Sequence, residues 1–401
     1  MDRKDSYLES EFDLELESSL DLNFNNLYEI ADEINGNLQG KSIAETVIKQ
    51  IEDPKATLDE WLALTVSKEV SDLHLVEGIE PIFRLNGELV PIQGTPVLYS
   101  EMITKMARLV CNDEQWATFL ADGEIDLAYE LKGAARFRIN IFRQKDTTSI
   151  AFRRIPIKIP NLTSLGMPDI LKDLIHKSQG LFLVTGPTGS GKSTTLAAML
   201  DYLNDTKNTH ILTLEDPIEY VHNHKKSIIS QREIGRDTDS FGNALRAALR
   251  QDPDVILVGE MRDFETISIA LTAAETGHLV LGTLHTSSAP ATIERIVDVF
   301  PAIQQPQVRS QLAGALLGVL SQRLLPTPDG NGRIAATEML VNNKGIAHII
   351  RSGKTHQISN MIQMGKNEGM HTMQAKIIQL ISAGRVDSDV AESYLEEGSE
   401  L

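Results

Sequence analysis

The sequence predicts an α/β protein in which a small α+β domain precedes a larger domain with a mostly parallel sheet. Two observations support this prediction. In the second half of the chain, short apolar strands alternate with helices, a pattern typical of a parallel sheet covered by helices on both faces. In the first half, strand-like runs follow one another with a hairpin signal between two of them, which indicates an antiparallel sheet.

The composition is that of a soluble globular protein, with 41% hydrophobic and 23% charged residues over 401 positions. No apolar run approaches the length of a membrane span, and the charged N-terminus is unlike a signal peptide. The net charge of −18 argues against nucleic acid as a partner, because duplex binding relies on Lys and Arg. The single cysteine, Cys111, excludes an internal disulfide and a cysteine-based zinc site. We expect Cys111 to be buried and the protein to be cytoplasmic.

Residues 1–55 form an acidic N-terminal extension in which apolar residues recur at steps of three, four or seven. Two interpretations stay open: a mostly disordered acidic tail, or a segment that lays a helical stripe into a partner's groove. A second short helical pattern covers 42–51. The apolar positions of the first pattern are Leu8, Phe12, Leu16, Leu20, Phe24, Leu27 and Ile34.

Residues 56–155 are predicted to form the small α+β domain. Its first helix is expected to begin at the capping box Thr57-Leu58-Asp59-Glu60 and to end near Glu69. A hairpin is predicted over 81–92, because Asn86-Gly87 is a strong hairpin turn. The other expected elements are strands over 71–76, 125–131, 135–142 and 149–155 and helices over 100–109 and 113–120.

Residues 156–168 are interpreted as a linker, because Pro156 and Pro160 interrupt regular structure. The second domain, 169–401, is expected to be mainly helical beyond Pro301, with one hairpin around 328–332. Its parallel strands are predicted over 181–184, 211–214, 255–258 and 279–283.

The segment from Gly186 to Ser193 fits the phosphate-loop pattern G-x-x-x-x-G-K-[ST], between an apolar strand and a helix predicted over 194–203. Its backbone N–H groups would cradle phosphate oxygens, aided by the helix dipole. Lys192 would reach the β- and γ-phosphates, and the Ser193 hydroxyl would ligate Mg²⁺. The chain is therefore predicted to bind a nucleoside triphosphate through Gly186, Pro187, Thr188, Gly189, Ser190, Gly191, Lys192, Ser193 and Thr194.

Polar residues follow three neighbouring strands. The segment from Asp254 to Glu260 is an apolar strand ending in a carboxylate, Glu260, and three carboxylates, Glu219 among them, follow the strand before it. His285 ends the next strand. Because the carboxyl ends of parallel strands meet at one edge, these residues are expected beside the phosphate loop. Glu219 and Glu260 are candidates for orienting water and for the metal shell, and His285 for sensing the γ-phosphate. His222, His224 and His278 are interpreted as structural.

Arginines of the small domain are candidates for the additional positive charge that the nucleotide site needs. In the strand around Arg138, polar residues share one sheet face and apolar residues the other, and Arg153 lies in the next strand. Such arginines are commonly only solvated. An arginine supplied by a neighbouring subunit would, however, stabilise the negative charge in the transition state of phosphoryl transfer.

Together these segments resemble the PilT-type motors of the type II/IV secretion ATPase superfamily, hexameric ATPases that retract type IV pili. The resemblance runs from about Thr57 to Arg385. The matching segments are 71–75, 136–142, 186–195 (Walker A), 215–220 (aspartate box), 252–263 (Walker B region), 277–286 (histidine box) and Gly369-Met370.

The resemblance implies a PAS-like domain followed by a RecA-like P-loop ATPase domain that binds ATP and Mg²⁺ between subunits. It implies that Glu219 and Glu260 are the catalytic acids, that His285 is the histidine-box residue and that Arg138 and Arg153 reach the nucleotide. It further implies a homo-hexamer at the inner face of the cytoplasmic membrane. The partners would be an inner-membrane pilus platform protein and a PilU-like or assembly ATPase.

The sequence departs from this family in two places. The extension before Thr57 is not part of the usual pattern. The segment Ala-Ile-Arg-Asn-Leu-Ile-Arg-Glu, tied in the family to retraction, corresponds here to 345–352, which retains the apolar positions and Arg351 but not the first arginine, the asparagine or the glutamate. A PilU-like accessory motor and a nucleotide-gated scaffold with little turnover therefore remain alternatives. An assembly ATPase is disfavoured because those proteins usually carry a four-cysteine zinc module.

Overall fold

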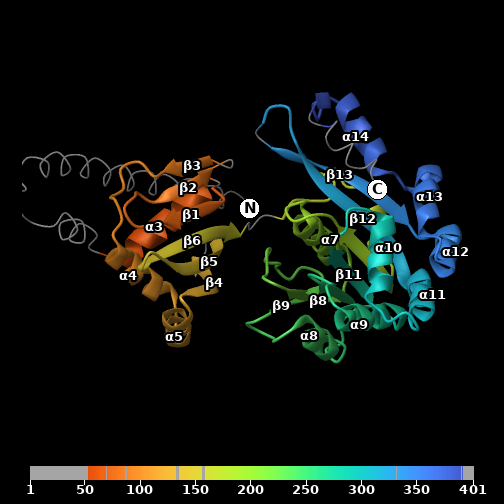
Figure 1. Ribbon diagram of the computed structural model, residues 1–401, viewed down its shortest axis with the longest axis horizontal. Helices are drawn as coiled ribbons and strands as arrows, with labels where there is room; N and C mark the ends of the chain where they lie inside the picture. The colour runs from red at the N-terminus through yellow and green to blue at the C-terminus, as the bar shows by residue number, and fades with distance from the viewer. Residues whose placement is uncertain are drawn as a thin grey trace, which may run out of the picture. The chain divides into compact units, whose positions relative to one another are not determined.

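The computed structural model describes residues 53–68, 70–85, 88–131, 135–155, 159–330, 332–389 and 391. The N-terminal extension up to residue 52 and the Asn86-Gly87 turn lie outside the described residues. Contacts divide the chain into two compact units, Met1–Pro156 and Ile157–Leu401 (Figure 1).

The first unit contains a six-stranded antiparallel sheet in the order β3-β2-β1-β6-β5-β4. Helices cover one face of it, as the predicted α+β class requires. Along β5 the burial alternates, with Phe137, Ile139 and Ile141 fully buried in the core. Cys111 is also buried. The elements are α3 (Pro54–Ser67), β1 (Asp72–Leu75), β2 (Ile82–Leu85), β3 (Glu88–Pro91), α4 (Ser100–Val110), α5 (Asp113–Asp122), β4 (Glu124–Leu131), β5 (Ala135–Gln144) and β6 (Thr147–Ile155).

The predicted start of the first helix is wrong. Helix α3 begins at Pro54, and Asp53 is its N-cap, with a carboxylate that accepts the N–H groups of Lys55 and Ala56. Thr57 already lies inside the helix, because its N–H donates to the Asp53 carbonyl at 3.1 Å. Asp at the N-cap followed by Pro at the first helical position is the stronger start signal of the two.

The second unit contains a seven-stranded sheet in the order β13-β12-β7-β11-β10-β8-β9, parallel except for the antiparallel pair β12–β13. The elements are α6 (Ile170–Ile175), β7 (Gly180–Thr185), α7 (Lys192–Thr206), β8 (His210–Glu215), β9 (Ile228–Glu233), α8 (Phe241–Ala248), β10 (Val255–Val258), α9 (Phe264–Glu275), β11 (Leu279–Leu284), α10 (Ala289–Asp298), α11 (Gln305–Ala315), β12 (Leu316–Pro326), β13 (Arg333–Val341), α12 (Lys344–Ser352), α13 (Ile358–Met364), α14 (Met373–Ser382) and two short 3₁₀ turns, Thr355–Gln357 and Lys366–Glu368.

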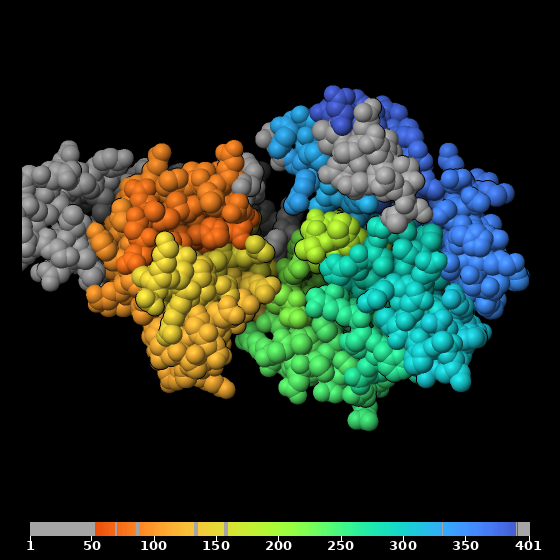
Figure 2. All heavy atoms as spheres, viewed as in Figure 1, coloured from red at the N-terminus to blue at the C-terminus, as the bar shows by residue number. Residues whose placement is uncertain are grey.

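Both faces of this sheet are buried, which confirms the predicted α/β class. Leu181 and Leu183 of β7 join one hydrophobic cluster, together with residues of α8 to α12. Phe182 and Val184 join a second cluster with α6 and α7 on the other face. Figure 2 shows α8 to α12, coloured green to blue, as a continuous surface on one side of this unit. Within the described ranges, no helix is both long and apolar enough to cross a membrane.

Three parts of the second unit differ from the sequence prediction. Strand β9 is not predicted, and the region beyond Pro301 is less helical than expected, since β12 and β13 form a long hairpin on the main sheet. The hairpin itself, around 328–332, is confirmed. Leu162 and Met167, in the expected linker, are buried in the core of the second unit. The chain after Leu162 therefore already packs as part of this unit.

Candidate active site

The loop between β7 and α7 carries the phosphate-loop motif. Gly186 has φ +145°, and a Cβ atom placed on it would lie 2.2 Å from the backbone oxygen of Gln322, so only glycine fits. Helix α7 begins at Lys192 without a side-chain N-cap hydrogen bond. Its first N–H groups are therefore available to an anion, which the helix dipole also attracts. The buried Ser190 hydroxyl has no hydrogen-bond partner in this part of the chain. A phosphate would supply the missing acceptor, so the loop fits the predicted ligand.

Lys192 is held over the loop. Its Nζ donates to the carbonyl oxygens of Gly186, at 2.9 Å, and Pro187, at 3.0 Å. Burial lowers the pKa of Lys192, and the nearby carboxylates of Glu260 and Glu219 partly oppose that shift. The structure thus brings both acids into electrostatic range of the phosphate-loop lysine.

Glu260 and His285 are in direct contact. Strands β10 and β11 are parallel neighbours, so the residues that follow them meet at one edge of the sheet. His285 Nε2 lies 3.1 Å from Glu260 Oε1, and Arg262 Nε pairs with the same oxygen. The Glu260 side chain is 19% exposed, against 44% for His285 and 73% for Arg262. A carboxylate that is mostly buried and shared by two cationic or polar groups is well fixed in orientation.

The carboxylates after β8 have different environments. Glu215 is mostly buried, and its carboxylate accepts hydrogen bonds from Thr213 Oγ1, Gln231 Nε2 and the backbone N–H of Glu219. Burial raises the pKa of Glu215, an effect that these hydrogen bonds reduce. Glu219 is exposed. Glu215 therefore fixes the turn on which Glu219 is presented.

The arginines predicted for the site lie in the first unit. Arg138 and Arg153 are register partners on β5 and β6. Arg138 Nη2 lies 3.5 Å from Asp126 Oδ2, and Arg153 Nε lies 2.8 Å from Asp72 Oδ1. The Arg153 side chain is still 71% exposed, so the pairing leaves it available to a further anion.

The remaining histidines make local contacts. His278 Nδ1 lies 3.1 Å from the Ala273 carbonyl at the end of α9, and His224 Nδ1 accepts the N–H of Ile229. His222 is buried, and its Nδ1 is among the buried atoms without a hydrogen-bond partner.

Two contributors to the site, Arg262 and Tyr220, were not predicted as site residues from the sequence. Arg262 lies in the predicted Walker B segment, and its spacing from Glu260 was the available signal. Tyr220 and Thr194 share a hydrogen bond of 2.9 Å. They come from separate segments, and nothing in the sequence pairs them.

Comparison with known proteins identifies the family. The model of the type II/IV secretion system protein family matches residues 53–393. The type IV pilus retraction ATPase PilT of Pseudomonas aeruginosa is 48% identical over 334 residues, which are 83% of this chain and 96% of PilT. PilU, a type IV pilus ATPase of the same organism, is 40% identical over 86% of this chain and 90% of its own length.

Two solved structures are also similar. A crystal structure of the pilus retraction motor PilT with bound ADP superposes with a TM-score of 0.79 at 46% identity, covering 83% of this chain and 95% of that one. The Legionella pneumophila ATPase DotB gives a TM-score of 0.75 at 29% identity, over 85% of this chain and 96% of DotB. From the family match and these identities, the chain belongs to the type II/IV secretion system protein family.

Proposed function

We propose that this protein is an ATP-hydrolysing motor that retracts type IV pili and so drives twitching motility. The observation that supports hydrolysis is the grouping of Lys192, Glu219, Glu260 and His285 around one phosphate loop. The similarity to PilT supports retraction as the work that this hydrolysis powers.

In this proposal the loop from Gly186 to Thr194 binds the phosphates of ATP, and Lys192 carries positive charge to the β- and γ-phosphates. Ser193, Glu219 and Glu260 would hold Mg²⁺ through their oxygen atoms, and the bound ion would neutralise charge on the phosphate oxygens. Glu260 orients the attacking water, and His285 holds the Glu260 carboxylate and senses the γ-phosphate. Most of the catalysis is thus positioning and electrostatic stabilisation.

The assembled form is proposed to be a homo-hexamer. In it, Arg138 and Arg153 of one subunit supply positive charge to the nucleotide of the next. The ring would lie in the cytoplasm against the inner face of the membrane, on an inner-membrane pilus platform protein, with a PilU-like or assembly ATPase as a partner motor. No nucleic acid is required.

An accessory motor is the second candidate, and helix α12 favours it. This helix covers the segment that departs from the retraction pattern. It buries Ile346, Ala347, Ile349 and Ile350, so the apolar positions serve the core. His348 and Ser352, two of the altered positions, are exposed. The differences therefore lie partly on a surface that a partner could bind, and they leave the catalytic groups unchanged.

Surface pilus number distinguishes these candidates. In a strain that lacks this gene we expect excess pili and lost twitching, both restored by the intact gene but not by its Glu260→Gln form. Glu275 is exposed at the C-terminal end of α9, and its Glu275→Gln variant is the control, which is expected to complement fully. Unchanged piliation in the deletion strain would reject retraction and leave the accessory role.

A further inference from the structure

The segment that carries Glu219 has no regular structure. Strand β8 ends at Glu215 and β9 begins at Ile228, and the twelve residues between them form neither helix nor strand. A catalytic group on such a segment needs anchors, because an irregular loop has no hydrogen-bond ladder of its own to fix it.

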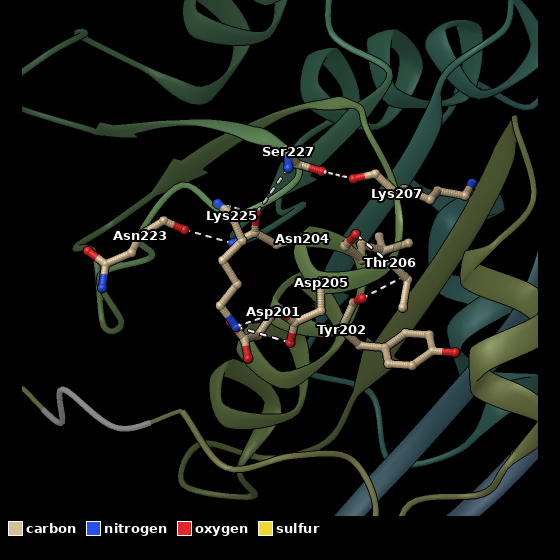
Figure 3. A network of polar contacts seen from close by, with 10 residues as sticks. Asp201, Tyr202, Asn204, Asp205, Thr206, Lys207, Asn223, Lys225 and Ser227 are labelled. Carbon is tan, nitrogen blue, oxygen red and sulfur yellow. Dashed lines mark hydrogen bonds and ion pairs between the residues drawn. The ribbon is translucent and has the colours of Figure 1, made fainter. Parts of the chain in front are cut away.

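The far end of this segment is attached to helix α7 by Asn204 (Figure 3). The Asn204 side chain is fully buried. Its Nδ2 donates to the Asn223 carbonyl at 2.7 Å, while its Oδ1 accepts the N–H groups of Lys225, at 3.0 Å, and Ser227, at 3.3 Å. One buried amide thus satisfies three backbone groups of the loop.

Lys225 adds a second attachment to the same helix. Its Nζ lies 2.8 Å from Asp201 Oδ1 and 3.0 Å from a carboxylate oxygen of Asp205. The three side chains converge in Figure 3. The Lys225 side chain is 38% exposed, so this ion pair contributes less than the buried amide.

The near end of the segment is attached through Tyr220. Its hydroxyl lies 2.9 Å from Thr194 Oγ1, in the first turn of α7 and next to Ser193. Gln231 Nε2 donates to the Tyr220 carbonyl at 2.8 Å. The Tyr220 side chain is buried, and burial raises the pKa of its hydroxyl, an effect that the hydrogen bond with Thr194 opposes and the Glu219 charge adds to. Tyr220 directly follows Glu219 in the chain, so an attachment of the tyrosine to α7 also restrains the acid.

The helix positions involved form one face. Thr194, Asp201 and Asp205 are separated by seven and four residues, which places them on the same side of α7. The helix that begins at the phosphate-binding lysine is therefore also the support along which the Glu219 segment lies.

We propose that Tyr220 is a positioning residue: its hydrogen bond to Thr194 sets the position of Glu219 relative to the phosphate loop, while Asn204 and Lys225 hold the rest of the segment on the same helix. This inference rests on the proposed function, in which Glu219 acts in ATP hydrolysis. Tyr220 itself acts only through Glu219.

The first test is Tyr220→Phe, which removes one hydroxyl and keeps the packed ring. We expect kcat to fall about 3–10-fold, the effect of losing one hydrogen bond. KM for MgATP and the affinity for ADP should change less than about twofold, because a loss confined to the transition state lowers kcat alone. Titration with ADP counts the folded sites, so that kcat is expressed per site. The matched control is Tyr202→Phe on the same helix, whose ring packs against His176 outside these attachments.

The second test separates positioning from a general structural role. In a Glu219→Gln background, Tyr220→Phe should cause no further loss, because residues that act through one another are not additive. An equal loss in both backgrounds, or a kcat unchanged by Tyr220→Phe, would overturn the inference while leaving the role of Glu219 intact. A Glu219→Gln variant with unchanged turnover would instead reject the proposed role of Glu219, and the positioning role with it.

Discussion

Replacing Glu260 by glutamine is expected to lower kcat for ATP hydrolysis by about 10²–10³-fold, the loss typical of removing one preorganised catalytic group. Glutamine has nearly the same shape but lacks the negative charge by which Glu260 is proposed to orient the attacking water. ADP binding should stay within about twofold, because the phosphate loop and Lys192 are unchanged. The measurement is steady-state ATPase activity beside an ADP titration of the same preparation.

Two further variants make this result specific. Lys192→Ala is expected to weaken nucleotide binding as well as turnover, because its Nζ is held directly over the loop. Glu275→Gln, exposed at the C-terminal end of α9, should leave nucleotide binding and turnover unchanged. Turnover unaffected by Glu260→Gln would favour the nucleotide-gated scaffold over the motor.

The position of the phosphate loop could be predicted from the sequence because its determinants are local. A buried strand, a glycine-rich turn and a helix that begins at Lys192 lie next to one another in the chain. The approach of Glu260 to His285 is not local, yet it follows from a general rule. Two parallel strands that are neighbours in a sheet end at the same edge, so the residues after them must meet.

The difference between Glu215 and Glu219 could not be predicted. Both are carboxylates after the same strand, and their spacing does not show which one is buried. The structure distinguishes them because Thr213 and Gln231 donate to Glu215. Gln231 lies on β9, a strand that the sequence pattern did not reveal. The contact of Tyr220 with Thr194 has the same origin, since it depends on how an irregular segment lies against α7.

The long hairpin of β12 and β13 shows a related limit. Its strands are apolar on both faces at many positions, so alternation does not distinguish them from buried helix segments. Only their pairing with β7 and with each other decides the assignment. This is why the region beyond Pro301 was expected to be mainly helical, apart from the turn.

The same hairpin places a histidine whose protonation should control stability. His371 Nε2 lies 2.9 Å from Thr337 Oγ1 of β13, and the His371 N–H donates to the Met339 carbonyl. Burial, with a smaller contribution from the Lys376 charge, lowers the pKa of His371 from 6.5 to about 4. The folded state therefore binds this proton less readily than the unfolded state does.

The sign of the effect follows from that difference. Because the folded pKa is depressed, the stabilisation is fully present above pH 6.5 and is lost as the pH falls through about 4. We expect this histidine to remove about 2 kcal/mol of unfolding free energy between pH 7 and pH 5, and about 3 kcal/mol by pH 4. Burial raises the pKa values of Glu215 and Glu338, which act in the opposite direction as the pH falls. The contribution of His371 must therefore be measured as a difference between variants.

His371→Gln provides that difference, because a glutamine amide can still contact Thr337 but does not titrate. Urea unfolding of the parent should show a steeper loss of stability from pH 7 to pH 5 than the variant, by about 2 kcal/mol. His348 is exposed on α12, and His348→Gln should lose unfolding free energy from pH 7 to pH 5 as steeply as the parent does. Equal slopes in the parent and in His371→Gln would show that the ring is not kept neutral by the fold. A steeper loss of stability in the parent and in His348→Gln than in His371→Gln would instead place this acid sensitivity of the second unit where His371 contacts β13.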